Sequence, residues 1–187
     1  KIRMAGIPVV SEIEFAGRYS KAKMIGITGT NGKTTTTMLI YHILQKAGLK
    51  VGLAGNIGKS FAMQVAEQDF DYYVLELSSF QLDDMYNFKC DIAILTNITP
   101  DHLDRYNYEL KNYVMAKFRI TQNQTAEDAF IYCADDALTT EYLPSVEVKS
   151  KKYPFSIKTK IEEGAYLEDQ QLIINTNNNQ FTMLIHE

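Results

Sequence analysis

The sequence predicts an α/β fold in which helices cover both faces of a mostly parallel β-sheet. Short, continuously apolar runs alternate along the chain with segments whose apolar residues recur at helical spacing. Strands of that kind belong to parallel sheets, because the crossover between two parallel strands usually places a helix against the sheet. The tail adds two apolar runs on either side of an Asn-rich turn, which predicts a small β-hairpin extension at the C-terminal end.

The expected elements follow one another in a regular order. Strands are expected near residues 23–28, 50–55, 71–77, 90–97, 129–134 and 147–155, with the hairpin between Ala165 and Glu187. Helices are expected at 33–48, near 58–67, around 110–120 and from Asp135. Upstream, Ser11 and Glu14 stand at the spacing of a capping box, which predicts one more short helix before the first strand.

Composition and charge are those of a globular protein with one domain of ordinary size. The 187 residues carry a net charge of −4 with both signs interspersed, which gives no reason to expect nucleic acid or an anionic membrane as a partner. No apolar run approaches the roughly 20 residues that span a bilayer. We therefore expect a cytoplasmic monomer. Its two cysteines, Cys90 and Cys133, are expected to be reduced, and no role is expected for His42 or His186.

The stretch GITGTNGKTTTT at 26–37 follows the first expected strand and opens the first expected helix, the context in which a P-loop match is credible. Its spacing is unusual, because Ile27 stands where the common pattern has its first glycine. Glycines still let backbone N–H groups approach phosphate oxygens. Lys33 would then reach the β- and γ-phosphates and the Thr34 hydroxyl would bind Mg²⁺. The alternative is an ordinary glycine-rich turn.

Two residues near strand ends suit a metal. Glu76 ends an apolar strand beside the P-loop, where a carboxylate can hold Mg²⁺ directly or through water; the alternative is a solvent-exposed acid. In TNITPDHLDRY, Thr99 is predicted to cap a helix whose first residue is Pro100, which places His102 in its first turn. A helix N-terminus favours a neutral, metal-competent imidazole, although a lone histidine is more often structural.

Lys117 occupies an unexpected position. On a helix Tyr113, Lys117 and Thr121 share one face with apolar residues, so the lysine points where a core residue belongs. In a low-dielectric site its amine is shifted towards the neutral form, which can add CO₂ and become a carbamate, an anion able to join His102 at a metal. The alternative is an ammonium that extends into solvent or pairs with an acid such as Asp101. The residues alone leave the two readings open.

The motifs TGTNGKTT, GNIG, ELSSFQLD, TNITPDHLDRY and MAKFRI, in this order and spacing, resemble the central ATPase domain of the Mur ligases of bacterial peptidoglycan synthesis. The resemblance is strong over residues 5–135 and weak over the remainder, and the family's own loop departs from the common pattern in the same way. It implies a P-loop-type sheet and an ATP-dependent ligase that forms an amide through an acyl phosphate. ELSSFQLD is most similar to members that add D-glutamate to UDP-N-acetylmuramoyl-L-alanine, and it implies those two substrates.

The resemblance also implies roles for single residues. The implied ATP-binding residues are Gly29, Thr30, Asn31, Gly32, Lys33, Thr34 and Thr35. The implied metal ligands are Thr34 and Glu76 for one Mg²⁺, and His102 and a carbamylated Lys117 for a second. The implied catalytic residues are Lys33, Asn56, His102 and Lys117, and the implied substrate contacts are Asn56, Ser78 and His102.

Family members have three domains, so the resemblance implies that this sequence is a fragment that does not complete turnover alone. Residues 1–20 are expected to be a linker and the end of an N-terminal UDP-binding domain, and residues 21–187 an incomplete central ATP-binding domain, with the C-terminal domain absent. Three other functions remain open: a Mur ligase for another amino acid, a folylpolyglutamate synthetase with the same ATPase core, and a nucleotide-dependent switch without ligation. The SSFQLD segment argues against the first two, but only through its resemblance to the family members that add D-glutamate.

Overall fold

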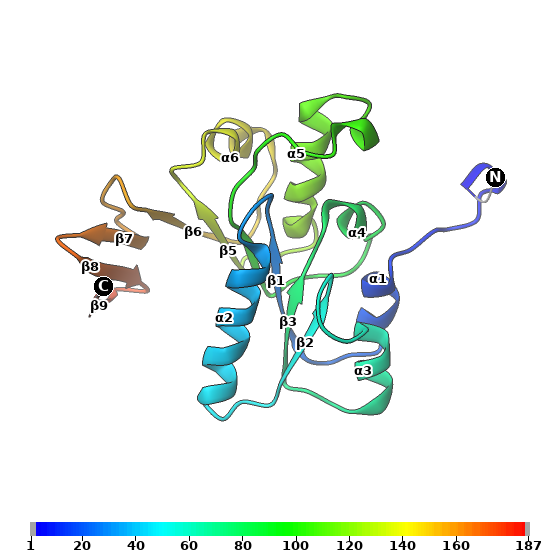
Figure 1. Cartoon of the computed structure of the whole chain (residues 1–187), viewed down its shortest axis with the longest axis horizontal. Coiled ribbons are helices and arrows are strands. Elements are labelled where there is room, and N and C mark those ends of the chain that lie inside the picture. The colour runs from blue at the N-terminus through cyan, green and yellow to red at the C-terminus, as the bar shows by residue number, and fades with distance from the viewer. Residues whose placement is uncertain (1–2, 186–187) are drawn as a thin grey trace.

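The computed structural model describes residues 3–185 and contains one nine-stranded sheet in the order β2-β3-β1-β4-β5-β6-β7-β8-β9 (Figure 1). The strands are β1 Lys23–Thr28, β2 Val51–Gly55, β3 Tyr72–Glu76, β4 Ile92–Leu95, β5 Ala129–Cys133, β6 Lys151–Ser156, β7 Gly164–Glu168, β8 Gln171–Thr176 and β9 Asn179–Leu184. Neighbours from β2 to β7 pair in parallel, and β8 pairs antiparallel with both β7 and β9.

Six α-helices and four short 3₁₀ helices connect the strands in the described part of the chain. The α-helices are α1 Glu12–Gly17, α2 Lys33–Lys46, α3 Phe61–Glu67, α4 Ser79–Asp83, α5 Leu110–Phe118 and α6 Ala137–Tyr142. The 3₁₀ helices are Arg3–Ala5, Leu103–Tyr106, Arg119–Thr121 and Leu143–Ser145. Within residues 3–185, no helix is long and apolar enough to cross a membrane.

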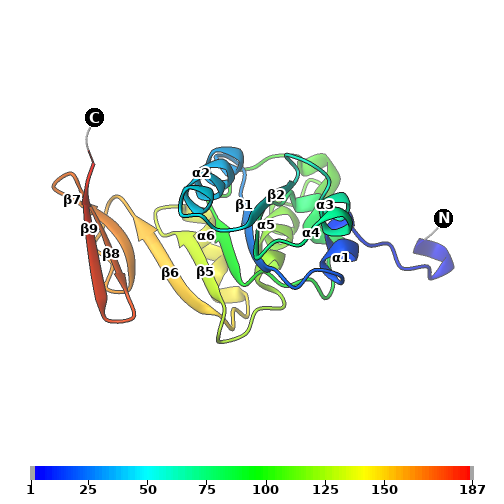
Figure 2. The ribbon, with the colours of Figure 1, turned by 90° about the horizontal axis from the view of Figure 1, so that it is seen from below.

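Two apolar cores lie on opposite faces of the sheet. The larger one joins strand residues to side chains from α1, α3, α4, α5 and α6, among them Phe61 and Tyr113. The smaller one consists of Ile25, Ile27, Val51, Val74 and Ile94, and α2 packs on it through Ile40, Tyr41 and Leu44. Figure 2 shows α2 on its own side of the sheet, away from α1 and α3. The predicted α/β fold with helices on both faces is confirmed.

The C-terminal extension has three strands where the sequence predicted two. The Asn-rich turn is at Asn177 and Asn178, which both have positive φ and join β8 to β9. A second tight turn with positive φ at Asp169 and Gln170 joins β7 to β8. The predicted hairpin is therefore confirmed as far as Ile185, and its last residues, including His186, lie outside the described residues.

One helix was missed and another is held differently from the prediction. The short α4 begins after Ser78, whose hydroxyl and backbone form a capping box with Gln81, so the Ser-x-x-Gln spacing was its only sequence signal. In α1, Ser11 caps the helix as predicted. Glu14, however, does not close a capping box, because its buried carboxylate accepts hydrogen bonds from the backbone of residues 86–88.

Candidate functional site

The glycine-rich loop lies between the carboxyl end of β1 and the start of α2 (Figure 1). Gly32 caps α2 with a φ of 79°, and Gly29 has a φ of 149°, backbone conformations that favour glycine. A Cβ atom on Gly29 would also collide with the hydroxyl of Thr96. The loop therefore stays narrow beside a helix N-terminus, whose first N–H groups lack partners within the helix and whose dipole attracts anions. This is an arrangement that binds phosphate groups.

Hydrogen bonds fix the loop to the segment that follows β4. The backbone N–H groups of Thr30 and Asn31 donate to the backbone and side-chain oxygens of Asn97, over 2.9 Å each. In return, the Thr96 hydroxyl donates to the Asn31 carbonyl over 2.7 Å. These roles of Thr96 and Asn97 were not predicted, although both residues stand in the TNIT segment of the sequence motifs. They hold the phosphate loop in one conformation.

Lys33 and Lys117 meet at one carbonyl oxygen. The Lys33 ammonium donates to the Gly29 carbonyl over 3.0 Å and to the Thr30 carbonyl over 2.8 Å. The Lys117 amine donates to the same Gly29 carbonyl over 2.7 Å and lies 4.6 Å from the centre of the Tyr113 ring. Lys117 is 2% exposed, so it does not extend into solvent. Burial lowers the pKa of Lys117 most, the charge of Lys33 lowers it further, and the resulting pKa is about 7.

Glu76 forms the centre of a second group of polar side chains. Its two carboxylate oxygens accept hydrogen bonds from the Thr34 hydroxyl over 2.7 Å and from the Asn56 amide over 2.9 Å. The Asn56 backbone N–H also donates to the Glu76 carbonyl over 2.8 Å. Glu76 is 2% exposed, and within residues 3–185 both partners of its carboxylate are neutral.

This group of side chains fits a hard divalent cation. A buried carboxylate with neutral partners is costly unless a cation compensates its charge, and carboxylate and hydroxyl oxygens are ligands that Mg²⁺ uses. No three His, Cys, Asp or Glu side chains in the described chain lie close enough together to hold a metal alone. A metal at Glu76 and Thr34 would therefore take waters or phosphate oxygens as its other ligands, as Mg²⁺ usually does.

The predicted helix beginning at Pro100 is wrong. The Thr30 hydroxyl accepts the N–H of Thr99 and donates to its carbonyl, over 3.0 Å each, so Thr99 is held by the phosphate loop and caps no helix. The first helical residue is Leu103. His102 precedes it with a φ of 49°, and its N–H donates to the Asp101 carboxylate. Thr30 bonds the backbone of Thr99, and Asp101 accepts the N–H of His102. These groups are therefore not available to form the predicted helix cap.

His102 is consequently an exposed loop residue. Of its side-chain surface 58% is accessible, its Nε2 lies 3.5 Å from an Asp101 oxygen, and its ring centre is 5.6 Å from that of Phe80. No hydrogen bond or ion pair joins it to Glu76 or Lys117 within residues 3–185. The predicted place of His102 in the first turn of a helix is therefore wrong.

The remaining predicted residue, Ser78, follows Glu76 by two positions. Its hydroxyl donates to the Gln81 side chain over 3.0 Å as part of the cap of α4. The structure thus links Lys33 to Lys117 through the Gly29 carbonyl that accepts from both. It links Thr34 to Asn56 through the carboxylate of Glu76. Ser78 and His102 follow the carboxyl ends of β3 and β4, the two strands that flank β1, without joining either group by a side-chain hydrogen bond within the described residues.

Tyr113 is a site residue whose role was not predicted. Its hydroxyl shares a hydrogen bond of 3.0 Å with the Thr30 hydroxyl, and its ring lies under the Lys117 amine. Burial raises the pKa of Tyr113, against a smaller lowering by Thr30. Tyr113 therefore connects the phosphate loop to α5. Tyr113 and Lys117 are one helical turn apart, so the spacing that placed Lys117 on the apolar face could also have placed Tyr113 beside it.

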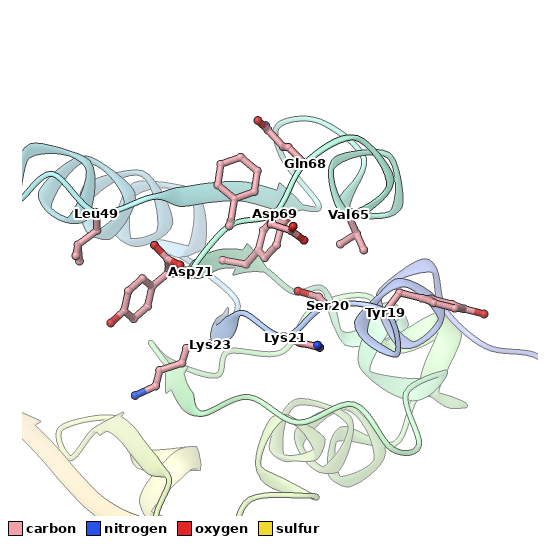
Figure 3. A pocket seen from close by; sticks show the side chains of 12 residues that line it. Tyr19, Ser20, Lys21, Lys23, Leu49, Val65, Gln68, Asp69 and Asp71 are labelled. Carbon is pink, nitrogen blue, oxygen red and sulfur yellow. The ribbon is translucent and has the colours of Figure 1, made fainter.

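A cavity of about 760 Å³ opens at the other end of the strands (Figure 3). Its lining includes Lys23 and Tyr72, the first residues of β1 and β3, together with Lys21 and Asp71. None of the predicted site residues contributes to it. The grouped polar side chains described above, and not this cavity, have the chemistry that the sequence predicted.

Residues 27–186 match the family model described as the Mur ligase middle domain. The chain belongs to the Mur ligase family. Curated relatives include UDP-N-acetylmuramoylalanine--D-glutamate ligase of Bacteroides fragilis, 64% identical over 93% of this chain and 39% of that protein. The ligase of the same name from Christiangramia forsetii is 57% identical over 98% of this chain and 41% of its own. This Mur ligase chain thus spans about two fifths of the relatives it matches.

Solved structures of a Mur ligase and of FolC share the fold at low sequence identity. The structure of UDP-N-acetylmuramoyl-L-alanyl-D-glutamate--2,6-diaminopimelate ligase aligns with 97% of this chain and 40% of that one, at a TM-score of 0.66 and 19% identity. FolC of E. coli in complex with DHPP and ADP aligns with 92% of this chain and 52% of its own, at a TM-score of 0.65 and 16% identity. These likenesses confirm the fold class of the Mur ligase middle domain.

Proposed function

We propose that the full-length protein is an ATP-dependent ligase that adds D-glutamate to UDP-N-acetylmuramoyl-L-alanine, and that this chain supplies its ATP-binding middle domain. Relatives 52–64% identical to this chain carry the name of that ligase. The observation that carries the proposal is the convergence of Lys33 and Lys117 on the Gly29 carbonyl, beside a phosphate-binding loop. The Lys33 ammonium at this loop suits a reaction among anions.

ATP is the proposed nucleotide. A solved MurF ligase from Thermotoga maritima is in complex with ADP, and a solved bifunctional folylpolyglutamate synthase has Mn and AMPPNP bound. In this chain the loop from Gly29 to Thr35 would surround the phosphates, with the Lys33 ammonium on their terminal oxygens. Thr34 and Glu76 would hold Mg²⁺, which supplies positive charge against the phosphate oxygens. His102 is proposed as a ligand of a second Mg²⁺.

The proposed reaction has two steps. An oxygen of the substrate's terminal carboxylate attacks the γ-phosphorus of ATP, so a P–O bond forms, the bond to the β-phosphate breaks and ADP leaves. The neutral amine of D-glutamate then attacks the acyl carbon, inorganic phosphate departs, and the amine loses its proton as the amide forms. Lys33 would stabilise the charge that shifts between phosphate oxygens in the first step. Asn56 and Ser78 are proposed to position the substrate.

Lys117 is proposed to become a carbamate. Only a neutral amine adds CO₂, and a pKa of about 7 supplies that form near neutral pH. The reaction of the amine with CO₂ forms an N–C bond and releases one proton, leaving a negative group. Its charge would end the repulsion between Lys117 and Lys33, and it could serve with His102 at the second metal. The burial of the Lys117 amine beside the Lys33 ammonium, where both donate to the Gly29 carbonyl, supports this assignment.

The test is phosphate release by the full-length protein with ATP, Mg²⁺ and UDP-N-acetylmuramoyl-L-alanine. D-glutamate, L-lysine, diaminopimelate and no acceptor are compared. Release with D-glutamate alone is expected. Release with another acceptor would keep the family and replace the proposed substrate, whereas release without any acceptor would favour a nucleotide-dependent switch.

A further inference from the structure

Thr28 carries a buried hydroxyl group that forms no hydrogen bond within residues 3–185. The residue is 0% exposed and ends β1. A buried polar group without a partner is costly, because burial removes its water and supplies nothing in exchange. Thr28 also immediately precedes Gly29, whose carbonyl accepts hydrogen bonds from both Lys33 and Lys117. The unpartnered hydroxyl therefore belongs to the last residue of β1 before the candidate site.

The side chain of Thr28 lies on the face of the sheet where α5 packs. Alternate residues along a strand share a face, and an added Cβ on Gly26 would contact Ile120, just beyond the end of α5. The register partner of Thr28 on β4 is Leu95, which belongs to the larger core together with residues of α5. The strand thus directs Thr28 towards the helix that carries Lys117, and away from α2.

The two residues after Thr28 contact α5 directly. The Gly29 carbonyl accepts the Lys117 amine over 2.7 Å, and the Thr30 hydroxyl shares a hydrogen bond of 3.0 Å with the Tyr113 hydroxyl. Residues 28–30 therefore run along the turn of α5 between Tyr113 and Lys117. No hydrogen bond joins Thr28 to Lys117 in this structure, since the Thr28 hydroxyl has no partner among the described residues.

A carbamate on Lys117 would need a hydrogen-bond donor here. The N–H that remains on the modified nitrogen can keep its bond to the Gly29 carbonyl, while the two new oxygens extend beyond it and carry the negative charge. A buried anion requires donors or cations around it. The Lys33 ammonium supplies charge, but the carbonyls of Gly29 and Thr30 that it binds only accept hydrogen bonds. A threonine hydroxyl can donate to a carboxylate-like oxygen.

We propose that Thr28 is a positioning residue whose hydroxyl donates a hydrogen bond to the carbamate of Lys117. The inference rests on the carbamate of the proposed function. The amine nitrogen attacks the carbon of CO₂, an N–C bond forms, one C=O electron pair moves to oxygen, and the nitrogen releases a proton to solvent. Thr28 transfers no proton. Its hydroxyl is unpartnered before this step and satisfied after it, so part of the cost of burying both groups is offset.

The experiment measures carbamate occupancy in the full-length protein. Carbon-13 NMR detects the carbamate carbon while carbon-13-labelled bicarbonate is titrated at fixed pH. Thr28→Val removes the hydroxyl and keeps the shape of the side chain, and it is expected to raise the bicarbonate concentration at half occupancy by roughly tenfold or more, since a hydrogen bond to a charged group is lost. Thr28→Ser keeps the hydroxyl and should stay close to the native value.

Thr37→Val is the matched control. Thr37 is also 0% exposed and its hydroxyl also lacks a partner within residues 3–185. It belongs to α2, which packs on the opposite face of the sheet. Its replacement should therefore leave carbamate occupancy unchanged. Equal losses in Thr28→Val and Thr37→Val would show a general effect of buried hydroxyls and would overturn the proposal.

The remaining outcomes separate this inference from the proposed function. Native occupancy in Thr28→Val, or an equal loss in Thr28→Ser, would overturn the role of the Thr28 hydroxyl and leave the carbamate in place. Absence of the carbamate signal from the native protein would overturn carbamylation and the role of Thr28 together. In CO₂-free buffer, the melting temperature of Thr28→Val should equal or exceed the native value, because an unpartnered hydroxyl is removed. A lowered melting temperature there would assign Thr28 a structural role instead.

Discussion

Lys33 and Lys117 donate hydrogen bonds to the same oxygen, the carbonyl of Gly29, over 3.0 and 2.7 Å. Two ammonium groups at one acceptor repel each other, and this repulsion adds to burial in lowering the pKa of Lys117. The repulsion is relieved if Lys117 is neutral, if it becomes an anion, or if a phosphate group binds between the two. All three outcomes suit a nucleotide-dependent enzyme.

Replacement of Lys33 is expected to abolish ligase chemistry. In the full-length protein, Lys33→Ala should lower ATP-dependent phosphate release by roughly two to three orders of magnitude, because the loop would lose the charge that stabilises the transferred phosphoryl group. The control is Lys46→Ala, at the exposed end of the same helix, which should retain normal rates. Near-normal turnover by Lys33→Ala would contradict the assignment of residues 29–35 as a P-loop.

The activity lost on replacement of Lys117 should be partly restored by a small anion. We expect Lys117→Ala to lose activity and to recover part of it when acetate or another short carboxylate is added, because such an anion can occupy the place of a carbamate. Lys33→Ala offers the contrast, since no carboxylate should restore it. Full activity of Lys117→Ala without any addition would show that the carbamate has no role.

The buried Lys117 also predicts how stability depends on pH. Its pKa is about 7 in the folded chain and near 10.5 when exposed, so between these values the unfolded state binds more protons. The free energy of unfolding should therefore rise with pH from about 7 towards 9, by at most about 1.4 kcal/mol per pH unit. Denaturant unfolding of Lys117→Met should lack this slope, and Lys111→Met, exposed on the same helix, should keep it.

Local sequence signals sufficed for the parts of the molecule that depend on neighbours in the chain. The strand, loop and helix around Lys33 follow from a short apolar run, glycines and helical periodicity. The burial of Lys117 follows from its spacing to Tyr113. Periodicity reports which way a side chain points, so it found the elements and the misplaced lysine.

Contacts between distant segments could not be read in this way. Threonine is a common helix cap, but the backbone N–H and carbonyl of Thr99 form hydrogen bonds with the Thr30 hydroxyl instead. Glu14 stands at the spacing of a capping box, but its carboxylate accepts hydrogen bonds from the backbone N–H groups of residues 86–88 instead. In each case a tertiary hydrogen bond replaced a local one of similar strength. The same competition made His102 an exposed loop residue.

Glu76 predicts a specific loss of metal affinity. The variant Glu76→Gln should weaken the Mg²⁺ dependence of nucleotide binding by roughly tenfold or more, because an amide lacks the charge that holds the cation. Titration of Mg²⁺ at fixed ATP in the full-length protein measures this. Asp71→Asn, just before the start of the same strand in the cavity of Figure 3, should bind Mg²⁺ and ATP normally. An unchanged Mg²⁺ requirement in Glu76→Gln would exclude Glu76 as a ligand.

The anchoring of α1 can be tested through Glu14. Its carboxylate is buried and accepts the N–H groups of Tyr86, Asn87 and Phe88 over 2.8–3.0 Å, and a hydrogen bond from Arg18. Burial raises the pKa of Glu14, but these donors together lower it further, so the net shift is downward. Glu14→Gln should therefore destabilise the chain by about 1–3 kcal/mol at neutral pH.

A carboxyl group with a lowered pKa stabilises the folded state above its unfolded pKa, and the contribution disappears as the pH falls through the folded value. The difference in unfolding free energy between the native chain and Glu14→Gln should therefore be constant above about pH 5 and shrink below about pH 4. The exposed Glu67→Gln, at the end of α3, should show no difference at any pH. A gap that persists unchanged into acid would mean that Glu14 acts through packing and not through its charge.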